Sequence, residues 1–244
     1  MKKSILLLFG VFLFFYGAKA TDITTHFTTN TTLTVANSPY IIVNSVNIND
    51  GVKVTVEEGV EIKFNSGRYL QVFGTLDAYG AKFTANGSTN KGYWDGIYVS
   101  SEGSSYLGTV SLDSCIVEYA GYLYSRKGTL TLRKTTLDNF SGHGVQLYSQ
   151  GTLDISQSTI KNSNNFPIYL NGPGMLKGTN DNVLTGNASN YIYLNFNDVS
   201  GTFNMPKFDI PYRLTTFRVT ETGTVNISPG VKLMNFNTEF TVRG

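Results

Sequence analysis

Apolar and polar residues alternate along most of the chain, in short segments separated by glycine, asparagine and aspartate. From Ser38 onward the alternating segments are rich in β-branched and aromatic residues, as in GVKVTV, VEIKF and YLQVFGTLDA. Such alternation predicts β-strands with one buried face, and the intervening Gly, Asn and Asp predict turns. No stretch after residue 20 has a helical period, so the sequence predicts an all-β protein.

A Gly-Thr pattern recurs in the middle of the chain. GTVSLDSCIVE, GTLTLRKTTLDN and GTLDISQSTIKN begin at Gly108, Gly128 and Gly151, at intervals of 20 and 23 residues. Repeats of this length are typical of stacked coils, in which each coil buries its apolar row against the next. Each unit contains two short strands, and a third recurs between units, as in Gly96-Ile97-Tyr98-Val99. We therefore predict a right-handed parallel β-helix, a solenoid with three short strands per coil.

The two ends of the chain differ from the middle. Residues 1–20 have two early lysines, an apolar run and Ala18-Lys19-Ala20, the pattern of a cleaved secretory signal. Residues 21–37 are expected to be an extended lead-in, and residues 38–209 the β-helix. Residues 210–244 resemble residues 38–74, with Tyr212 matching Tyr40, which predicts the start of a second, truncated module.

The C-terminal segment predicts self-association. Its apolar residues continue to the last coil without a polar cap, and an uncapped solenoid end exposes unpaired strand edges. We therefore expect a chain spanning residues 21–244 to associate through this edge.

Charge and cysteine content exclude several partners. Without Lys2, Lys3 and Lys19 the chain has 16 basic and 17 acidic residues, a net charge of −1. No clustered basic surface suited to nucleic acid is present. After the signal no stretch is long enough to span a membrane. Cys115 is the only cysteine, so no intrachain disulfide forms, and we expect it to be an ordinary small residue.

The Gly-Thr coils resemble right-handed parallel β-helix repeats of the pectate-lyase type. The segments VTVEEGVEIKFNSGRYLQVFGTLDAYG and YWDGIYV are similar to large secreted surface proteins of Bacteroidetes-type bacteria. The resemblance implies an exported chain at the cell surface. It predicts the fold better than the function, because many activities share this scaffold.

The first enzymatic candidate is His143, within Gly142-His143-Gly144, since polygalacturonase-like β-helix enzymes carry a Gly-His-Gly motif near paired aspartates. The chain lacks that Asp-Asp pair. Glycoside hydrolysis needs two carboxyl groups facing one bond. Our alignment places Asp138 beside Val117 and Lys161 and Glu118 beside Asn139, so the two acids lie diagonally. A solvent-facing histidine in a turn is therefore the favoured interpretation.

A polysaccharide lyase is the second enzymatic candidate. It needs a base and a cation, and Asp138, His143, Lys161 and Arg133 are the residues that adjacent coils bring to one side. Cross-strand ion pairs explain the same cluster without catalysis. The two histidines, His26 and His143, lie far apart in sequence, so we expect no metal site and no cofactor.

A row of aromatic residues is the favoured candidate for a binding surface. The outward position of the third strand is predicted to hold Tyr98, Leu123, Gln146, Tyr169 and Tyr193. Exposed aromatic rows suit sugar rings or a protein partner. Stacking that only stabilises the sheet is the alternative explanation.

Two function classes follow from these observations. The favoured one is a secreted or cell-surface β-helix without catalysis of its own, serving as a binding, adhesion or structural module with a glycan or cell-surface partner. The alternative is a polysaccharide lyase or glycoside hydrolase acting on an acidic polysaccharide.

Overall fold

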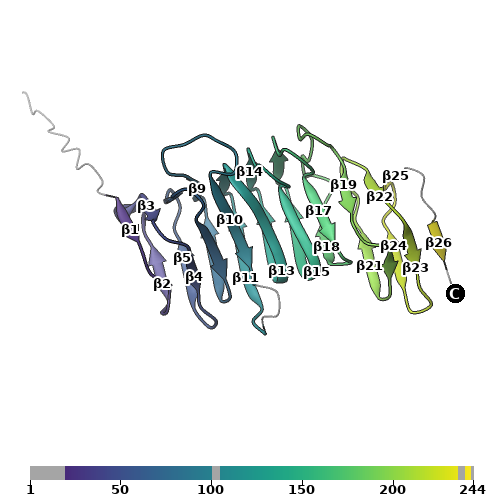
Figure 1. Cartoon of the computed structure of the whole chain (residues 1–244), viewed down its shortest axis with the longest axis horizontal. Helices are drawn as coiled ribbons and strands as arrows, with labels where there is room; N and C mark the ends of the chain where they lie inside the picture. Colours follow the sequence, from purple (N-terminus) through teal and green to yellow (C-terminus); the bar gives the residue numbers. More distant parts are fainter. Residues whose placement is uncertain (1–19, 101–104, 236–239, 243–244) are drawn as a thin grey trace, which may run out of the picture.

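The alternating segments form short parallel strands that stack coil upon coil. The computed structural model describes residues 20–100, 105–235 and 240–242. It is a parallel β-solenoid of about nine turns, seen from the side in Figure 1. Strands make up 53% of the described residues and helix 1%, which confirms the all-β prediction. Apart from Ala20, the predicted signal lies outside the described residues.

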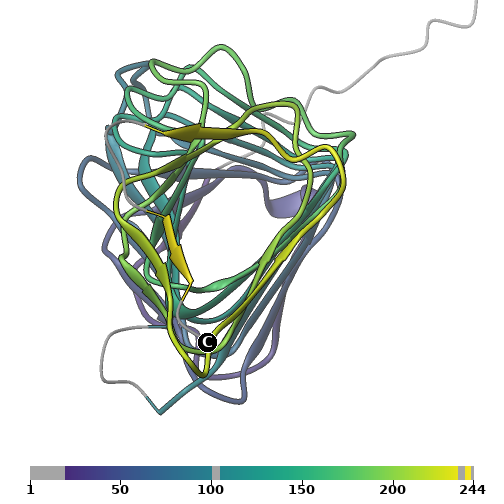
Figure 2. The same ribbon diagram turned by 90° about the vertical axis from the view of Figure 1, so that its right-hand side faces the viewer.

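Each coil has three sides, and Figure 2 shows the roughly triangular outline seen along the axis. Face 1 is a single parallel sheet formed, in order, by β1 (Thr21–Ile23), β3 (Tyr40–Ile42), β6 (Glu61–Phe64), β9 (Lys82–Ala85), β12 (Ile116–Glu118), β14 (Thr136–Asp138) and β16 (Thr159–Lys161). Face 2 is formed by β4 (Val46–Ile48), β7 (Tyr69–Val72), β10 (Trp94–Val99), the first parts of β13 (Ala120–Arg133) and β15 (Val145–Ser156), then β17 (Ile168–Asn171), β19 (Ile192–Leu194), β22 (Tyr212–Leu214) and β25 (Leu233–Asn235). Face 3 is formed by β2 (Thr31–Leu33), β5 (Lys53–Val56), β8 (Thr75–Tyr79), β11 (Gly108–Asp113), the second parts of β13 and β15, and β18 (Met175–Gly178).

The last coils continue this arrangement with shorter strands. A three-stranded sheet contains β20 (Asp198–Val199), β23 (Phe217–Val219) and β26 (Phe240–Val242), and a two-stranded sheet contains β21 (Thr202–Met205) and β24 (Thr224–Ile227). The only helical turn in the described residues is η1 (Val35–Asn37), a short 3-10 segment in the lead-in.

The glycine of the Gly-Thr repeat lies at the corner between faces 2 and 3. Strands β13 and β15 run through this corner without interruption, so the backbone must pass close to the coil below. A Cβ added at Gly128 would lie 2.2 Å from the carbonyl oxygen of Gly108, and one at Gly151 would lie 2.4 Å from that of Ser125. Gly128 also has a φ of +104°, which other residues rarely adopt. The repeat therefore marks a position where only glycine fits.

Inward residues form continuous apolar rows along the axis. One row on face 2 contains Val46, Leu70, Ile97, Leu123, Val145, Ile168 and Ile192. The ring of Trp94 stacks on Phe64 with centroids 3.9 Å apart, and its Nε1 donates a 2.9 Å hydrogen bond to the carbonyl oxygen of Glu118. These rows supply the continuous core that a chain without disulfides needs.

The coil from Cys115 to Tyr124 differs by one residue from the sequence alignment. Val117, not Ile116, shares the buried row with Leu137, and Ile116 is 43% exposed. Leu123 is buried, and Tyr124 points outward instead. Two adjacent apolar residues fit either phase of a strand, and a slip of one residue moves every side chain to the other face.

The segment that resembles residues 38–74 continues the same solenoid. Strands β22, β23 and β24 pair in parallel with β19, β20 and β21. Tyr40 lies on face 1, whereas its counterpart Tyr212 lies on face 2. Both tyrosine hydroxyls donate to a carbonyl six residues upstream, at Thr34 and Pro206. Residues 210–244 thus lie one face further around the axis than the residues 38–74 that they resemble. The start of a second module at residue 210 stays a prediction.

Candidate functional site

The aromatic surface lies on face 2, in the row of outward positions at the centre of each strand. Strand pairing places Gln71, Tyr98, Tyr124, Gln146, Tyr169, Tyr193 and Arg213 in this row. Of the predicted row, Tyr98, Gln146, Tyr169 and Tyr193 are in register. The prediction was wrong for Leu123, which points into the core because the register of this coil differs by one residue from the sequence alignment.

The rings fall into two groups on either side of Gln146. In the first group Tyr98 stacks on Tyr69 and Tyr124, with centroids 5.1 and 4.2 Å apart. The Arg126 guanidinium lies over the Tyr124 and Tyr148 rings, 5.5 and 4.4 Å from their centroids. Gln146 Nε2 donates a 3.0 Å hydrogen bond to the Tyr148 hydroxyl.

The second group surrounds Tyr169. His143 stacks on Tyr169 at 4.4 Å and on Phe166 at 5.1 Å, and Tyr193 stacks on Tyr169 at 5.6 Å. Arg213 lies over the ring of Tyr193, 5.5 Å from its centroid. Its Nη1 also donates a hydrogen bond to the hydroxyl of Tyr191. Each aromatic group therefore includes an arginine that packs on its rings.

Stacking along the axis determines what face 2 presents to solvent. The ring of Tyr98 lies face to face with that of Tyr124, and the ring of Tyr169 with that of Tyr193, so the edges of these rings face outward. Burial raises the pKa of Tyr98, Tyr124 and Tyr169 above the ordinary value, so these hydroxyls stay protonated at neutral pH. The surface therefore offers a row of hydroxyl donors and acceptors, with two guanidinium groups and several amides beside them.

Two segments border face 2. The connection between β9 and β10 extends along the axis, and Lys91 Nζ donates a 3.0 Å hydrogen bond to Oδ1 of Asn164, 73 residues further on. Figure 1 shows this connection rising above the strands between β9 and β10. At the opposite border Tyr106 packs edge-on against Phe73, with centroids 5.7 Å apart.

Sequence reasoning missed the flanking residues of this surface. Tyr69, Tyr122 and Tyr191 lie two positions before the central row, and Arg126 lies two after it. Because strand residues i and i+2 point to the same face, spacing was a usable signal for these residues once the register was known. His143 and Phe166 precede their strands, and no periodicity indicates that they pack on the row.

The two acids proposed for hydrolysis lie on face 1 and not on the aromatic surface. Glu118 and Asp138 are directly in register on β12 and β14, so the diagonal placement was wrong by the same one-residue slip. Glu118 Oε1 accepts from Lys82 Nζ and from the Thr84 hydroxyl, both at 2.8 Å.

Asp138 is likewise partnered. Its Oδ2 lies 3.5 Å from Lys161 Nζ, and its Oδ1 accepts a 2.8 Å hydrogen bond from Asn162 Nδ2. The hydrogen bond to Glu118 raises the pKa of Lys82, which keeps that cation charged. This arrangement is a cross-strand ladder of compensated charges.

The four residues proposed for a lyase do not form one cluster. Asp138 pairs with Lys161 on face 1, whereas Arg133 lies at the end of face 3 and binds Asp113 through Nε at 2.8 Å. Burial acts to raise the pKa of Asp113, but hydrogen bonds from Arg133 and Ser114 outweigh it and lower the pKa.

His143, the remaining residue proposed for a lyase, packs in the aromatic surface. Burial lowers its pKa to about 4, so the imidazole is neutral at physiological pH. Its Nδ1 is buried without a hydrogen-bond partner. The imidazole stacks on both Phe166 and Tyr169 and contributes to packing, so the side chain is half-buried rather than solvent-facing as predicted.

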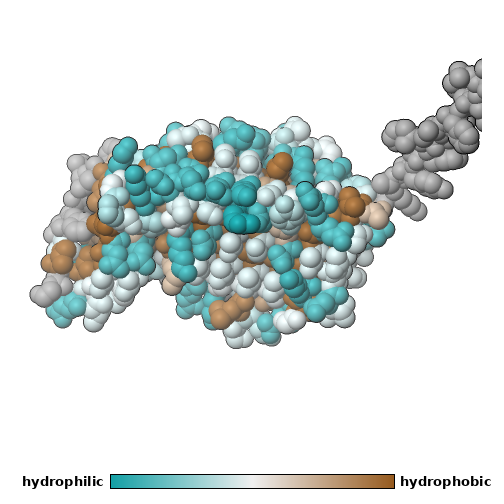
Figure 3. Space-filling view, turned by 180° about the vertical axis from the view of Figure 1, so that it is seen from behind, coloured by the Kyte–Doolittle hydropathy of each residue, from teal (hydrophilic) through white to brown (hydrophobic). Residues whose placement is uncertain are grey.

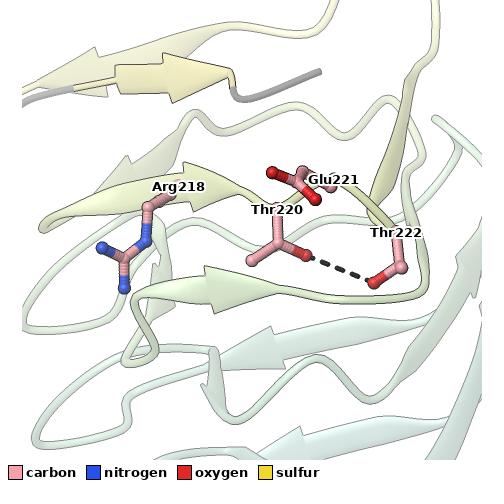
Figure 4. A pocket seen from close by; sticks show the side chains of 4 residues that line it. All are labelled: Arg218, Thr220, Glu221 and Thr222. Atoms are coloured by element: carbon pink, nitrogen blue, oxygen red, sulfur yellow. Dashed lines mark hydrogen bonds between the residues drawn. The ribbon is translucent and has the colours of Figure 1, made fainter.

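Depressions elsewhere on the surface have linings in which most polar side chains are hydrogen-bonded. One of about 420 Å³ is lined by Arg218, Thr220, Glu221 and Thr222 (Figure 4). Arg218 donates two 2.7 Å hydrogen bonds to Asp198, and the two threonine hydroxyls donate to Val199 and Ser200 carbonyls. A second, of about 450 Å³, lies beside Glu118 and Lys82 on face 1.

Other chemistry finds little support in the described residues. Burial raises the pKa of the Cys115 thiol to about 11, and the side chain is 1% exposed. In the ranges that the structure describes, no three His, Cys, Asp or Glu side chains gather as metal ligands. Among the same residues no helix is long and apolar enough to cross a membrane.

No protein-family model matches the chain, and comparison with curated proteins and with solved structures gives no match either. The parallel solenoid rests on the strand pairing itself. The resemblance to pectate-lyase-type and Bacteroidetes surface proteins stays a prediction.

Proposed function

We propose that this chain is a non-catalytic binding module of a secreted or cell-surface protein, and that face 2 binds an extended glycan. The observation that carries the proposal is the aromatic surface, which spans the strands from β7 to β22 on one face. Aromatic side chains with bonded polar tips are enriched at binding surfaces. Export rests on the sequence pattern of residues 1–20.

The form of the surface supports a long ligand. Hydroxyl and amide groups repeat once per coil along the solenoid axis, at a spacing of about 4.8 Å. A linear polymer that lies along this axis meets the same kind of hydrogen-bonding group at every step. The segments at both borders of face 2 favour this direction over a perpendicular one.

Binding is tested with a panel of soluble polysaccharides by affinity electrophoresis. We expect at least one polysaccharide to retard the protein, and Tyr169→Ala and Tyr193→Ala to weaken that retardation without unfolding the solenoid. Thr131→Ala, an outward change on face 3, is the matched control. A panel without any retarding polysaccharide, or retardation unaffected by both tyrosine changes, contradicts the proposal.

A glycoside hydrolase is the second candidate, because Glu118 and Asp138 are in register on adjacent strands. Each carboxylate is compensated by a lysine, which favours a structural role. We expect no release of reducing ends or unsaturated sugars from uronic-acid polymers. Release that is lost in Glu118→Gln or Asp138→Asn establishes the enzyme instead.

A further inference from the structure

The depression on face 1 has the size and lining of a small-molecule site. Its volume is about 450 Å³, within the range of roughly 300–1,000 Å³ that is usual for such sites. Residues 87–89, in the connection between β9 and β10, form one wall, and Tyr119 also lines it. The floor holds outward side chains of three adjacent strands: Glu61, Lys63, Lys82, Thr84 and Glu118.

The wall is held in place on both sides of residues 87–89. Before them, Asn86 Nδ2 donates a 2.8 Å hydrogen bond to Asn65 Oδ1. After them, Lys91 Nζ donates a 3.0 Å hydrogen bond to Asn164 Oδ1. The connection between β9 and β10 is therefore tied to other coils at two points, and the depression is preformed.

Tyr119 occupies a backbone position that suits asparagine better. It follows β12 directly, as Asn139 follows β14 and Asn162 follows β16, and the residues before the three are in register. All three have a left-handed backbone, with φ of +62°, +60° and +57°. Asparagine adopts this conformation readily, whereas a bulky side chain is strained in it. Strained residues are found preferentially at binding and active sites, so a contact with a ligand explains a tyrosine here.

The lining keeps hydrogen-bonding capacity that the described residues do not use. Glu118 Oε1 accepts from Lys82 and Thr84, but Glu118 Oε2 has no hydrogen-bond partner among the described residues. The side chain of Glu118 is only 16% exposed, so its carboxylate is held in one place. Among the same residues the hydroxyls of Thr89 and Tyr119 are also unbonded, although both residues line the depression.

The charges on the floor cancel. Lys82 pairs with Glu118 at 2.8 Å, and Lys63 pairs with Glu61 at 3.0 Å. An anionic ligand would meet two carboxylates and two lysines that are already paired. A neutral ligand with several hydroxyl groups can donate to Glu118 Oε2 and accept from Lys82 without breaking either pair. A sugar unit carries such hydroxyl groups on a ring with an apolar face, which suits an aromatic side chain.

We propose that the face 1 depression binds one neutral sugar unit, with hydroxyl groups of the sugar bonded to Glu118 and Lys82 and its ring packed on Tyr119. This site goes beyond the function proposed above, because it lies on another face and takes a single unit rather than a length of polymer. Thr89 supplies a further hydroxyl from the wall.

NMR of the isotope-labelled chain spanning residues 21–244 tests the site. Trp94 is the only tryptophan, so the spectrum has one indole N–H signal. This N–H donates a 2.9 Å hydrogen bond to the carbonyl oxygen of Glu118, which makes it a reporter at the floor of the depression. The probes are the methyl glycosides of glucose, galactose, mannose and N-acetylglucosamine. We expect a saturable shift with at least one of them, and weaker binding of glucuronic acid.

Two variants separate a binding role from a structural one. Tyr119→Asn should weaken binding at least tenfold and leave the melting temperature unchanged or higher, because asparagine suits this backbone. A purely structural tyrosine would instead lose stability when replaced. Glu118→Gln should weaken binding roughly tenfold, the loss expected for a hydrogen bond to a charged group.

A blocking variant tests the depression without changing a strand. Thr89→Arg places a long side chain at the wall and should abolish binding. Asn90→Arg is the matched control, because it makes the same charge change at a neighbouring residue outside the lining. This pair keeps the test intact if Tyr119→Asn fails to fold.

Several results would overturn the proposal. These are no saturable shift with any neutral methyl glycoside, unchanged affinity in both Tyr119→Asn and Glu118→Gln, tighter binding of glucuronic acid, and equal effects of Thr89→Arg and Asn90→Arg.

A face 2 variant distinguishes this site from the aromatic surface. Tyr169→Ala should leave the shift of the Trp94 signal intact, and its loss in that variant would place the sugar on face 2 and overturn the face 1 site. Retardation by polysaccharides is measured separately, so binding on face 2 stands or fails independently of these titrations.

Discussion

Residues that look alike in sequence have different roles because of the row that each occupies. Ile116 and Val117 are adjacent apolar residues, yet the first is exposed and the second lies in the core. Tyr122 and Tyr124 point outward from face 2, while Leu123 between them is buried. The direction of each side chain, inward or outward, therefore determines whether a residue belongs to the core or to the aromatic surface.

A pair of alanine substitutions tests this register. Leu123→Ala should destabilise the protein by about 2–5 kcal/mol, because it leaves a cavity in the face 2 row. Ile116→Ala should change stability by less than about 0.5 kcal/mol, as expected for a surface position. Chemical denaturation followed by the fluorescence of Trp94, the only tryptophan, measures both. Equal losses in the two variants contradict the register.

His143 predicts a pH dependence of stability. Burial lowers its pKa from 6.5 to about 4, so the unfolded chain binds this proton more readily than the folded one. The stability that the neutral, buried His143 contributes is fully present above pH 6.5. It is lost progressively as the pH falls through 6.5 toward 4, because protonation favours the unfolded chain. His143→Phe keeps the stacked ring and removes the titration. When the pH is lowered from about 6.5 to 5, the melting temperature of this variant should fall less than that of the wild type. Curves of melting temperature against pH that are parallel for the two proteins contradict the assignment to His143.

At the scale of the strand, the corner between faces 2 and 3 depends on glycine. Strands β13 and β15 cross it as single continuous strands, and the chain passes against the carbonyl groups of the previous coil. This close approach explains why the Gly-Thr pattern is the most regular feature of the sequence.

Gly128→Ala should therefore be strongly destabilising. The added Cβ would lie 2.2 Å from backbone, which cannot move aside as a flexible side chain does, and the φ of +104° adds strain. Gly201→Ala, where nothing lies within 4 Å of the added Cβ, is the matched control. Thermal unfolding should show a large drop for the first and a small change for the second. Similar melting temperatures for the two variants contradict the close approach.

The strands and their grouping into coils could be predicted from sequence, because alternation and the Gly-Thr period are local signals. The register of the coil from Cys115 to Tyr124 could not, because the pairs Ile116-Val117 and Leu123-Tyr124 fit both phases of alternation. That one slip produced three errors, at Ile116, at Leu123 and in the placement of Glu118 against Asp138. Four residues of the predicted row, Tyr98, Gln146, Tyr169 and Tyr193, are in register, and their role in binding stays a prediction. The stacking of His143 on Phe166 and Tyr169 depends on contacts between coils, which no local pattern indicates.

At the scale of the whole molecule, the three faces of the solenoid differ in the side chains they carry. Faces 1 and 3 carry compensated ion pairs, and face 2 carries the aromatic surface. Apolar side chains are exposed in the last coils, where Ile227, Leu233 and Val242 are 46%, 44% and 66% exposed. Figure 3 shows apolar residues gathered at this end of the molecule.

The polypeptide spanning residues 21–244 should self-associate through these coils. Unpaired strand edges and exposed apolar side chains favour pairing with a second copy. Sedimentation velocity at tens of micromolar should show species larger than the monomer. The double change Ile227→Lys and Leu233→Lys should shift the distribution toward monomer, whereas Met175→Lys, in the middle of the solenoid, should not. A clean wild-type monomer contradicts this prediction.

The central claim is that face 2 is the binding surface, and tyrosine side-chain NMR tests it most directly. With labelled tyrosine rings and a polysaccharide that retards the protein in affinity electrophoresis as ligand, we expect shifts for the face 2 residues Tyr98, Tyr124, Tyr169 and Tyr193. Tyr40, which is buried on face 1, and Tyr79, on face 3, should remain unchanged. Shifts confined to Tyr79 or to rings outside face 2 would contradict the account.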